Sequence, residues 1–154
     1  MARKVATARS ERTKGRVKSA SRRTGAIETT SRGMVLVVDD DASILRSLKR
    51  LVSASGFEVK TFGKPSELLA SEMPRSNACM VVDIDLPEMN GIEMCEVLKR
   101  SGRCLPTILI TGRTDTKTRS MAEQSDAIAV LFKPFDEDPL LDAIARALAL
   151  STGC

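Results

Sequence analysis

Polar side chains that can bind a metal ion or a phosphoryl group follow several short apolar runs of this chain. Two carboxylates, Asp39 and Asp40, follow MVLVV, and a third, Asp83, follows CMVV. The hydroxyl of Thr111 follows PTILI, and the ammonium of Lys133 follows VLF. If these runs are parallel strands of one sheet, their carboxyl ends lie at one edge and the polar groups converge on a single site. Such a site can hold a divalent cation and a phosphoryl group.

The ligand types indicate which chemistry the site would support. Three carboxylates close together repel one another, which either raises a pKa or recruits a cation. Oxygen ligands without histidine or thiolate favour Mg²⁺ or Mn²⁺. An aspartate carboxylate can attack phosphorus to give an acyl phosphate, and Asp83, in the central run, is the candidate. Lys133 and Thr111 can then stabilise negative charge on the phosphoryl oxygens.

Each of these residues alone has an ordinary structural explanation. An aspartate after a strand often caps a helix, a single lysine usually belongs to a solvated face, and threonine is common after strands. Their occurrence in order at successive strand ends is what indicates function.

The elements that must position these residues alternate along the chain from residue 34 onward. Five runs are typical of strands, at 34–38, 57–62, 78–84, 105–110 and 127–132. Five segments between and after them are typical of helices: 42–54 capped by Asp41, a short one after Pro65, one opened by Asn90-Gly91, a weak one at 114–124 anchored by Met121 and Ala122, and one capped by Asp136. Short connections between such pairs demand right-handed crossovers. We therefore predict an α/β fold with a doubly wound five-stranded parallel sheet and helices on both faces.

Charge divides the chain into two parts. Residues 1–33 carry ten Lys or Arg and two acids, a net charge of +8, although the whole chain has only +4. They have almost no apolar periodicity, so we expect a disordered basic tail, followed by one domain over 34–150 and a short end at 151–154. The tail can be read as a nucleic-acid arm, a transit-type presequence or a partner-docking segment. Alternatively, Met34 is the true start and nothing upstream is needed for folding.

Composition excludes several classes of protein. Histidine is absent, which removes histidine-based triads, histidine metal sites and any role as a phosphohistidine carrier. The four cysteines lie in no metal-ligand spacing, and we expect thiols in a reducing cytosol rather than disulfides. No apolar run approaches the roughly 20 residues that a membrane span needs. We expect a cytoplasmic protein that makes no membrane contact.

Four motifs resemble the receiver domains of bacterial two-component response regulators: VLVVDDD (35–41), VVDIDLPEMNG (81–91), ILITG (108–112) and LFKPF (131–135). The resemblance covers roughly residues 34–150 and is strongest to receivers of the nitrogen-fixation regulator type. It implies the flavodoxin-like receiver topology and a phosphoprotein of signal transduction or a phosphorelay.

The resemblance also assigns roles to individual residues. It implies Asp83 as phosphoacceptor, Asp39 and Asp40 as the acid pair that binds Mg²⁺, and the backbone carbonyl of Asp85 as a further metal ligand. It implies Thr111 as the switch hydroxyl and Lys133 as the phosphate partner. It further suggests a cis bond between Lys133 and Pro134. Asp85 and Arg113 flank the site and could tune hydrolysis of the acyl phosphate.

The sequence departs from the family pattern at two places. Val130 stands where members usually carry an aromatic residue that swings inward when the threonine engages phosphate, and Asp126-Ala127 stands where Gly-Ala is usual. Phosphorylation chemistry should survive these changes, whereas the usual relay to the surface lacks its aromatic residue.

The expected function is that of a single-domain response regulator, because the chain ends soon after the fifth helix. A sensor histidine kinase or phosphotransfer protein would phosphorylate Asp83, and the product would dock to a protein partner. We expect no enzymatic activity beyond self-catalysed phosphorylation and dephosphorylation. A homodimer through the fourth and fifth helices is a further option, and nucleic-acid contact is expected only through residues 1–33.

Three alternatives stay open. A pseudo-receiver would never take phosphate. A nucleic-acid binder would act through the basic tail with the domain as its sensor. A small aspartyl-phosphate phosphatase would use Asp83-Ile84-Asp85, although that class expects a cap and a longer chain.

Overall fold

The computed structural model describes residues 32–151. The strands are β2 (Met34–Val38), β3 (Glu58–Phe62), β4 (Ala78–Asp83), β5 (Thr107–Thr111) and β6 (Ala129–Phe132). The helices are α1 (Ala42–Ala54), α2 (Pro65–Leu69), α3 (Gly91–Arg100), α4 (Thr116–Gln124) and α5 (Glu137–Ala149). Every strand and helix predicted from the sequence is present, with ends shifted by at most a few residues.

The five strands form one parallel sheet in the order β3-β2-β4-β5-β6. The order reverses between β2 and β4, which are neighbours although β3 lies between them in the chain. In open parallel sheets the crevice at such a switch point, outside the carboxyl ends of the strands, is where ligands bind. The predicted α/β architecture is therefore confirmed.

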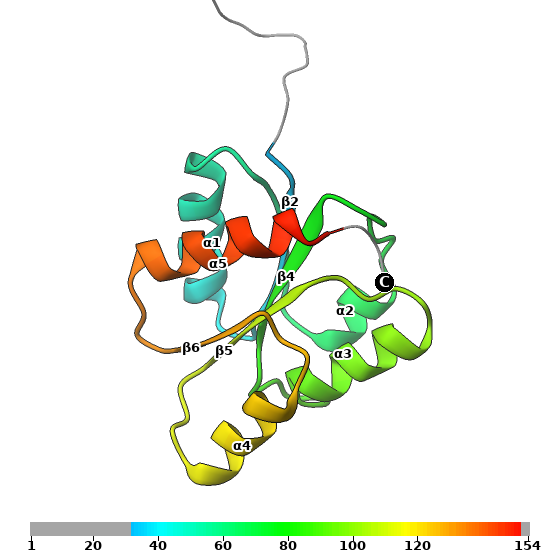
Figure 1. The fold of residues 1–154 in the computed structure, drawn as a ribbon, viewed down its shortest axis with the longest axis vertical. Coiled ribbons are helices and arrows are strands. Elements are labelled where there is room, and N and C mark those ends of the chain that lie inside the picture. Colours follow the sequence, from blue (N-terminus) through cyan, green and yellow to red (C-terminus); the bar gives the residue numbers. More distant parts are fainter. Residues whose placement is uncertain (1–31, 152–154) are drawn as a thin grey trace, which may run out of the picture. The chain divides into compact units, whose positions relative to one another are not determined.

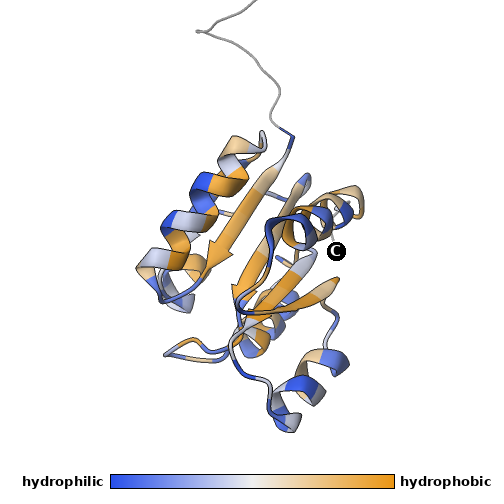
Figure 2. Cartoon of the chain, turned by 90° about the vertical axis from the view of Figure 1, so that its left-hand side faces the viewer, coloured by the Kyte–Doolittle hydropathy of each residue, from blue (hydrophilic) through white to orange (hydrophobic). Residues whose placement is uncertain are grey.

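Alternate residues of the central strands supply two separate apolar cores, because successive side chains point to opposite faces. Val35, Val37 and Val81 pack with α1 and α5 on one face, whereas Leu36 and Val82 pack with α2 and α3 on the other. Figure 1 shows these two helix pairs on opposite sides of the sheet. Figure 2 shows apolar strands between helices that are polar on their outer faces. This two-sided burial explains why the central strands read as continuous apolar runs.

Helix caps fix where the loops after the strands turn. The side chain of Asp41 accepts hydrogen bonds from the amides of Ser43 and Ile44 at the start of α1, as predicted. Asn90 and Glu93 form a reciprocal capping box at the start of α3. Asp136 occupies the N-cap position of α5, but its side chain makes no capping hydrogen bond.

Helix α4 is the least embedded of the five and extends away from the sheet (Figures 1 and 2). Only Thr118 and Ala122 of this helix are buried, and Met121, expected as an anchor, is partly buried. Asp115 caps the helix by accepting from the Thr118 amide at 3.1 Å. The weak apolar pattern of 114–124 thus corresponds to a helix that the core holds at few points.

Two residues upstream of Met34 take part in the fold. The amide of Arg32 donates to the carbonyl of Gly56 at 3.1 Å, and the amide of Glu58 donates to the carbonyl of Gly33 at 2.9 Å. The Arg32 guanidinium lies over the Phe57 ring at 4.6 Å. Residues 32 and 33 thus contact the domain, and the interpretation that nothing before Met34 is needed for folding stays a prediction. The rest of the predicted tail, residues 1–31, lies outside the described part of the chain.

Two of the four cysteines, Cys79 and Cys95, are free thiols as expected. Burial raises the pKa of Cys79 to about 12 and that of Cys95 to about 11, so both stay protonated at neutral pH. The expectation of a thiol was wrong for Cys104, which is disulfide-bonded. No spacing in the sequence marked it for pairing, and Cys154 lies outside the described residues. Among residues 32–151, no helix has both the length and the apolar character that crossing a membrane requires.

Candidate functional site

The polar residues singled out from the sequence lie together at the carboxyl edge of the sheet. Asp83 is the last residue of β4 and Thr111 the last of β5, while Asp39 and Lys133 directly follow β2 and β6. The register places Asp83 beside Ile110, and Thr111 beside Phe132. Because all the strands run parallel, four strand ends contribute to one site, as the sequence predicted.

Three carboxylates form a compact cluster at this edge. Asp39, Asp40 and Asp83 each place an oxygen within 4.8 Å of the others. Asp39 is fully buried, Asp83 is 3% exposed, and Asp40 faces solvent. Buried carboxylates so close together need a compensating cation. An all-oxygen set that is open to water on one side fits Mg²⁺, which keeps several of its own waters when bound by one or two carboxylates.

Lys133 supplies one positive charge to this cluster. Its Nζ atom lies 2.9 Å from Asp39 Oδ2 and 3.3 Å from Asp83 Oδ2. Burial lowers the pKa of Lys133, but the hydrogen bond to Asp39 and the charges of both carboxylates outweigh this effect and raise its pKa above the ordinary value. The side chain thus stays an ammonium at neutral pH. A single ammonium does not balance three carboxylates, which is consistent with a cation site.

Burial also acts on Asp83. Desolvation raises its pKa above the ordinary value, and the charge of Asp39 adds to this effect. The hydrogen bond from the Asp85 amide to Asp83 Oδ1, at 3.1 Å, and the Lys133 ammonium work in the opposite direction. A carboxylate that is poorly hydrated and held from two sides has the geometry that a nucleophile would need.

Backbone amides hold the two buried carboxylates in place. The Asp41 amide donates to Asp39 Oδ1 at 2.9 Å, in the same i to i+2 pattern that links Asp85 to Asp83. These short loops lie between a strand and the following helix, where the amides turn back toward the strand end. Both carboxylates thereby keep one oxygen directed at Lys133.

Thr111 is fully buried, and its hydroxyl has two partners. It donates to Asp85 Oδ2 at 2.8 Å and accepts from the Arg113 amide at 3.0 Å. The sequence indicated Asp85 through its backbone carbonyl, whose role as a metal ligand stays a prediction, and as a flanking residue that could tune hydrolysis. The carboxylate contact with Thr111 was not expected. The signal for this contact would have been that Asp85 follows β4 and Thr111 ends β5, since these two strands are neighbours in the sheet.

Gly91 is a further site residue that the sequence marked only as the start of a helix. Its amide donates to the Ile84 carbonyl at 2.9 Å. A Cβ atom here would clash with the backbone carbonyl of Asp83 and would lie 2.7 Å from Val82 Cγ1. A residue without a side chain therefore lets α3 begin directly against the strand that ends in Asp83.

The usual aromatic position is occupied by Val130, which is half-buried and packs against the core. An aromatic ring lies two residues further along, at Phe132, which is the register neighbour of Thr111. The guanidinium of Arg119 in α4 sits over that ring at 4.9 Å. The Lys133-Pro134 bond is cis, as predicted.

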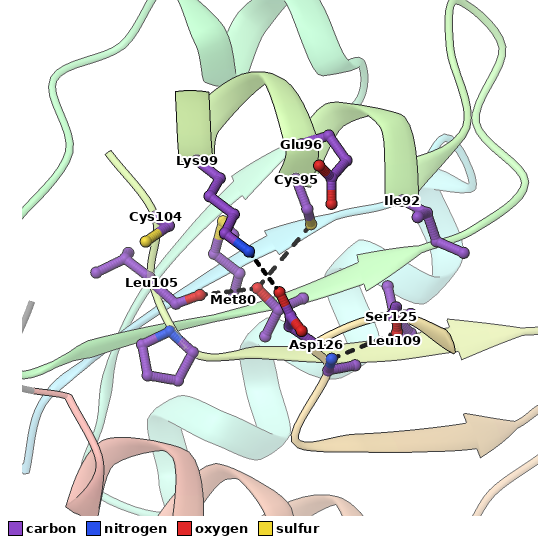
Figure 3. A pocket seen from close by; sticks show the side chains of 13 residues that line it. Met80, Ile92, Cys95, Glu96, Lys99, Cys104, Leu105, Leu109, Ser125 and Asp126 are labelled. Carbon is purple, nitrogen blue, oxygen red and sulfur yellow. Dashed lines mark hydrogen bonds and ion pairs between the residues drawn. The ribbon is translucent and has the colours of Figure 1, made fainter. Parts of the chain in front are cut away.

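Two cavities open near these elements. One, of about 550 Å³, lies between α1 and the start of α5 and has Lys133, Phe135 and Ile44 among its walls. The other, of about 250 Å³, lies between α3 and the start of β5, with the paired Lys99 and Asp126 beside it (Figure 3). Neither cavity is lined by the clustered carboxylates, and only the first includes a residue of the site, Lys133.

Comparison with known proteins gives a family match. The model of the response regulator receiver domain matches residues 35–145. Nodulation protein W of Bradyrhizobium diazoefficiens is 38% identical over 123 residues, which are 80% of this chain and 54% of that protein. Response regulator protein TodT of Pseudomonas putida is 33% identical over 129 residues, 83% of this chain and 57% of that one. The chain thus spans about half the length of these curated relatives.

Solved structures agree with the fold. The response regulator StyR superposes with a TM-score of 0.71 at 39% identity, over 78% of this chain and 61% of that one. A CheY-like receiver domain protein from Methanospirillum hungatei superposes with a TM-score of 0.68 at 29% identity, over 78% of this chain and 96% of that one.

Proposed function

The chain belongs to the response regulator receiver domain family of two-component signalling, and from this premise we propose that Asp83 accepts a phosphoryl group in a Mg²⁺-dependent reaction. Response regulators receive phosphoryl groups from sensor kinases, and a histidine kinase or phosphotransfer protein is the donor we infer here. The observation that carries the proposal is the position of Asp83. It ends the central strand, is 3% exposed, and lies in one cluster with Asp39, Asp40 and Lys133.

In the proposed reaction a carboxylate oxygen of Asp83 attacks the phosphorus atom of the donor. A new O–P bond forms as the donor's P–N bond, or the P–O bond of acetyl phosphate, breaks, and the leaving group keeps the electron pair. The product is an acyl phosphate. Receiver domains are in general not classical enzymes, and we infer that this chain catalyses only its own phosphorylation and dephosphorylation.

Receiver domains use Mg²⁺ at their acidic pocket, and the acid cluster of this chain fits that ion. The carboxylates of Asp39, Asp40 and Asp83 and the backbone carbonyl of Asp85 would hold it. When bound, Mg²⁺ offsets the charge of the acids and of the incoming phosphoryl oxygens. Asp40 is exposed and can therefore contribute without breaking a buried contact.

Two side chains would stabilise the phosphoryl group on Asp83. The Lys133 ammonium, already 3.3 Å from Asp83 Oδ2, would pair with one phosphoryl oxygen. The Thr111 hydroxyl would donate to another from the end of the neighbouring strand. Both groups stand on strand ends, so their positions are set by the sheet rather than by long loops.

We further propose that phosphorylation changes how the domain docks to a protein partner. Val130 stands in place of the usual aromatic residue, so the usual route from the site to the surface lacks its ring. The contact of Arg119 with the Phe132 ring is another route from the site to α4. Phe132 adjoins Thr111 in the sheet, and Arg119 Nε also donates to the Thr114 carbonyl at 3.2 Å. A movement of Thr111 toward phosphate would therefore reach α4, the least embedded helix.

The proposal is tested by incubating the protein with acetyl phosphate and following its intact mass. A gain of one PO₃ group in the presence of Mg²⁺, and none when the metal is chelated, supports it. Asp126→Asn removes an exposed acid outside the site. It controls for the loss of one negative charge and should label like the wild type. Equal labelling with and without Mg²⁺ would contradict the proposal.

A further inference from the structure

The hydroxyl that the proposed reaction needs is already engaged. Thr111 Oγ1 donates to Asp85 Oδ2 at 2.8 Å and accepts from the Arg113 amide at 3.0 Å. A threonine hydroxyl has a single hydrogen to donate. It cannot serve the Asp85 carboxylate and a phosphoryl oxygen on Asp83 at full strength at the same time.

We propose that Asp85 is a positioning residue that withholds the Thr111 hydroxyl from the phosphoryl group and so weakens phosphoryl binding at Asp83. This inference rests on the proposed function, since it concerns the competition for one hydrogen between two acceptors of the same site. The bond between Thr111 and Asp85 must then break before the Thr111 hydroxyl can donate to the phosphoryl group on Asp83.

The contact is of a kind that resists breaking. Its acceptor is a carboxylate, and hydrogen bonds to ionised groups are roughly twice as strong as neutral ones. Its donor is fully buried, so water does not replace the lost partner at Thr111, although the Asp85 carboxylate is exposed and water can replace the hydroxyl there. The Arg113 guanidinium, 3.9 Å from Asp85 Oδ1, is largely exposed and adds little to the contact.

The backbone around Asp85 keeps the carboxylate in place. The Asp85 amide donates to Asp83 Oδ1 at 3.1 Å, which fixes the loop directly after β4. The side chain alone makes the contact with Thr111. Truncating it therefore leaves in place both the amide contact and the backbone carbonyl assigned to the metal.

A competing physical explanation makes the same first prediction. The negative charge of Asp85 would repel a phosphoryl group without any involvement of Thr111. Both explanations predict tighter phosphoryl binding after Asp85→Ala. They differ in whether that gain requires the Thr111 hydroxyl, which a double-mutant cycle measures.

The experiment compares the wild type, Asp85→Ala, Thr111→Val and the double variant. Calorimetric titration with Mg²⁺ and beryllofluoride, a phosphoryl mimic, gives the affinity, and intact mass gives the rate of labelling by acetyl phosphate. We expect Asp85→Ala to bind beryllofluoride about tenfold more tightly. The same substitution in the Thr111→Val background should change the affinity by less than about twofold. Asp85→Asn keeps an acceptor oxygen and should lie closer to the wild type than Asp85→Ala.

The outcomes distinguish the proposed role of Asp85 from the proposed function of Asp83. If Asp85→Ala raises the affinity for beryllofluoride equally in both backgrounds, or does not raise it at all, the proposed role of Asp85 is overturned while Asp83 still takes the phosphoryl group. If the wild type neither binds beryllofluoride nor gains a phosphoryl group, the proposed function fails, and the proposed role of Asp85 fails with it. Thermal melts of all variants report folding, and Asp126→Asn controls for the loss of one negative charge.

Discussion

Lys133 Nζ lies 2.9 Å from Asp39 Oδ2, although 94 residues separate the two in the chain. Asp39 is fully buried, and the lysine side chain is 22% exposed. The contact joins the end of β2 to the end of β6, past the ends of β4 and β5 that lie between them in the sheet. It therefore links the metal side of the proposed site to its phosphate side.

Replacing Lys133 should leave two buried carboxylates without their ammonium. We expect Lys133→Met to lower the free energy of unfolding by roughly 3 kcal/mol in metal-free buffer, because removing one partner strands a buried charge. Urea denaturation followed by circular dichroism measures the change. Lys99→Met is the matched control, because Lys99 pairs with Asp126 at 2.7 Å on the exposed surface and its loss should destabilise the protein far less. Equal losses in the two variants would contradict the role assigned to Lys133.

Magnesium should stabilise the folded protein through the acid cluster. A ligand that binds only the folded state raises stability, so we expect the melting temperature to rise with Mg²⁺ concentration. Asp40→Asn should remove most of that rise while leaving the metal-free melting temperature nearly unchanged, since Asp40 faces solvent. An undiminished Mg²⁺ effect in this variant would show that the ion binds elsewhere.

The raised pKa of Asp83 has a consequence for pH dependence in metal-free buffer. Burial makes the folded state bind this proton more tightly than the unfolded state does. Stability therefore falls as the pH rises from the ordinary value of about 3.9 through the raised pKa. Asp83→Asn lacks this loss, so its stability relative to the wild type should increase from about pH 3 to about pH 7. Melting temperatures across that range measure it, and a flat or opposite trend would refute the electrostatic account.

The close approach at Gly91 predicts a steric effect on the site. Gly91→Ala should destabilise the protein by about 1–3 kcal/mol, because the added methyl group clashes with the Asp83 carbonyl and the neighbouring strand cannot move freely. It should also slow labelling of Asp83. Gly112→Ala is the control for stability, since a Cβ atom there has nothing within 4 Å. Chemical denaturation of both variants decides whether α3 is packed as tightly as described.

The sequence was sufficient for the sheet because its inner strands, β2, β4 and β5, are buried on both faces. Runs such as 78–83 cannot be mistaken for half-exposed strands, and the polar residue that ends each run marks the carboxyl edge. Parallel pairing then brings Asp39, Asp83, Thr111 and Lys133 together without knowledge of any side-chain conformation.

Contacts between loops could not be predicted in the same way. The bond from Thr111 to Asp85 depends on the rotamers of two loop-flanking side chains, which no periodicity encodes. Arg32 contacts the β2–β3 edge partly through its backbone amide, which every residue type except proline shares, and partly through a guanidinium that lies over the Phe57 ring, which no periodicity encodes. The pairing of Cys104 likewise had no local spacing to reveal it.

The most direct test of the account is to locate the phosphoryl group on the labelled chain. The protein is incubated with acetyl phosphate and Mg²⁺, digested, and the mass of each acid-containing peptide is measured. The account predicts one added PO₃ group on the peptide that contains Asp83, and none on any peptide of Asp83→Asn. A phosphoryl group on another residue, or equal labelling of the two proteins, would contradict it.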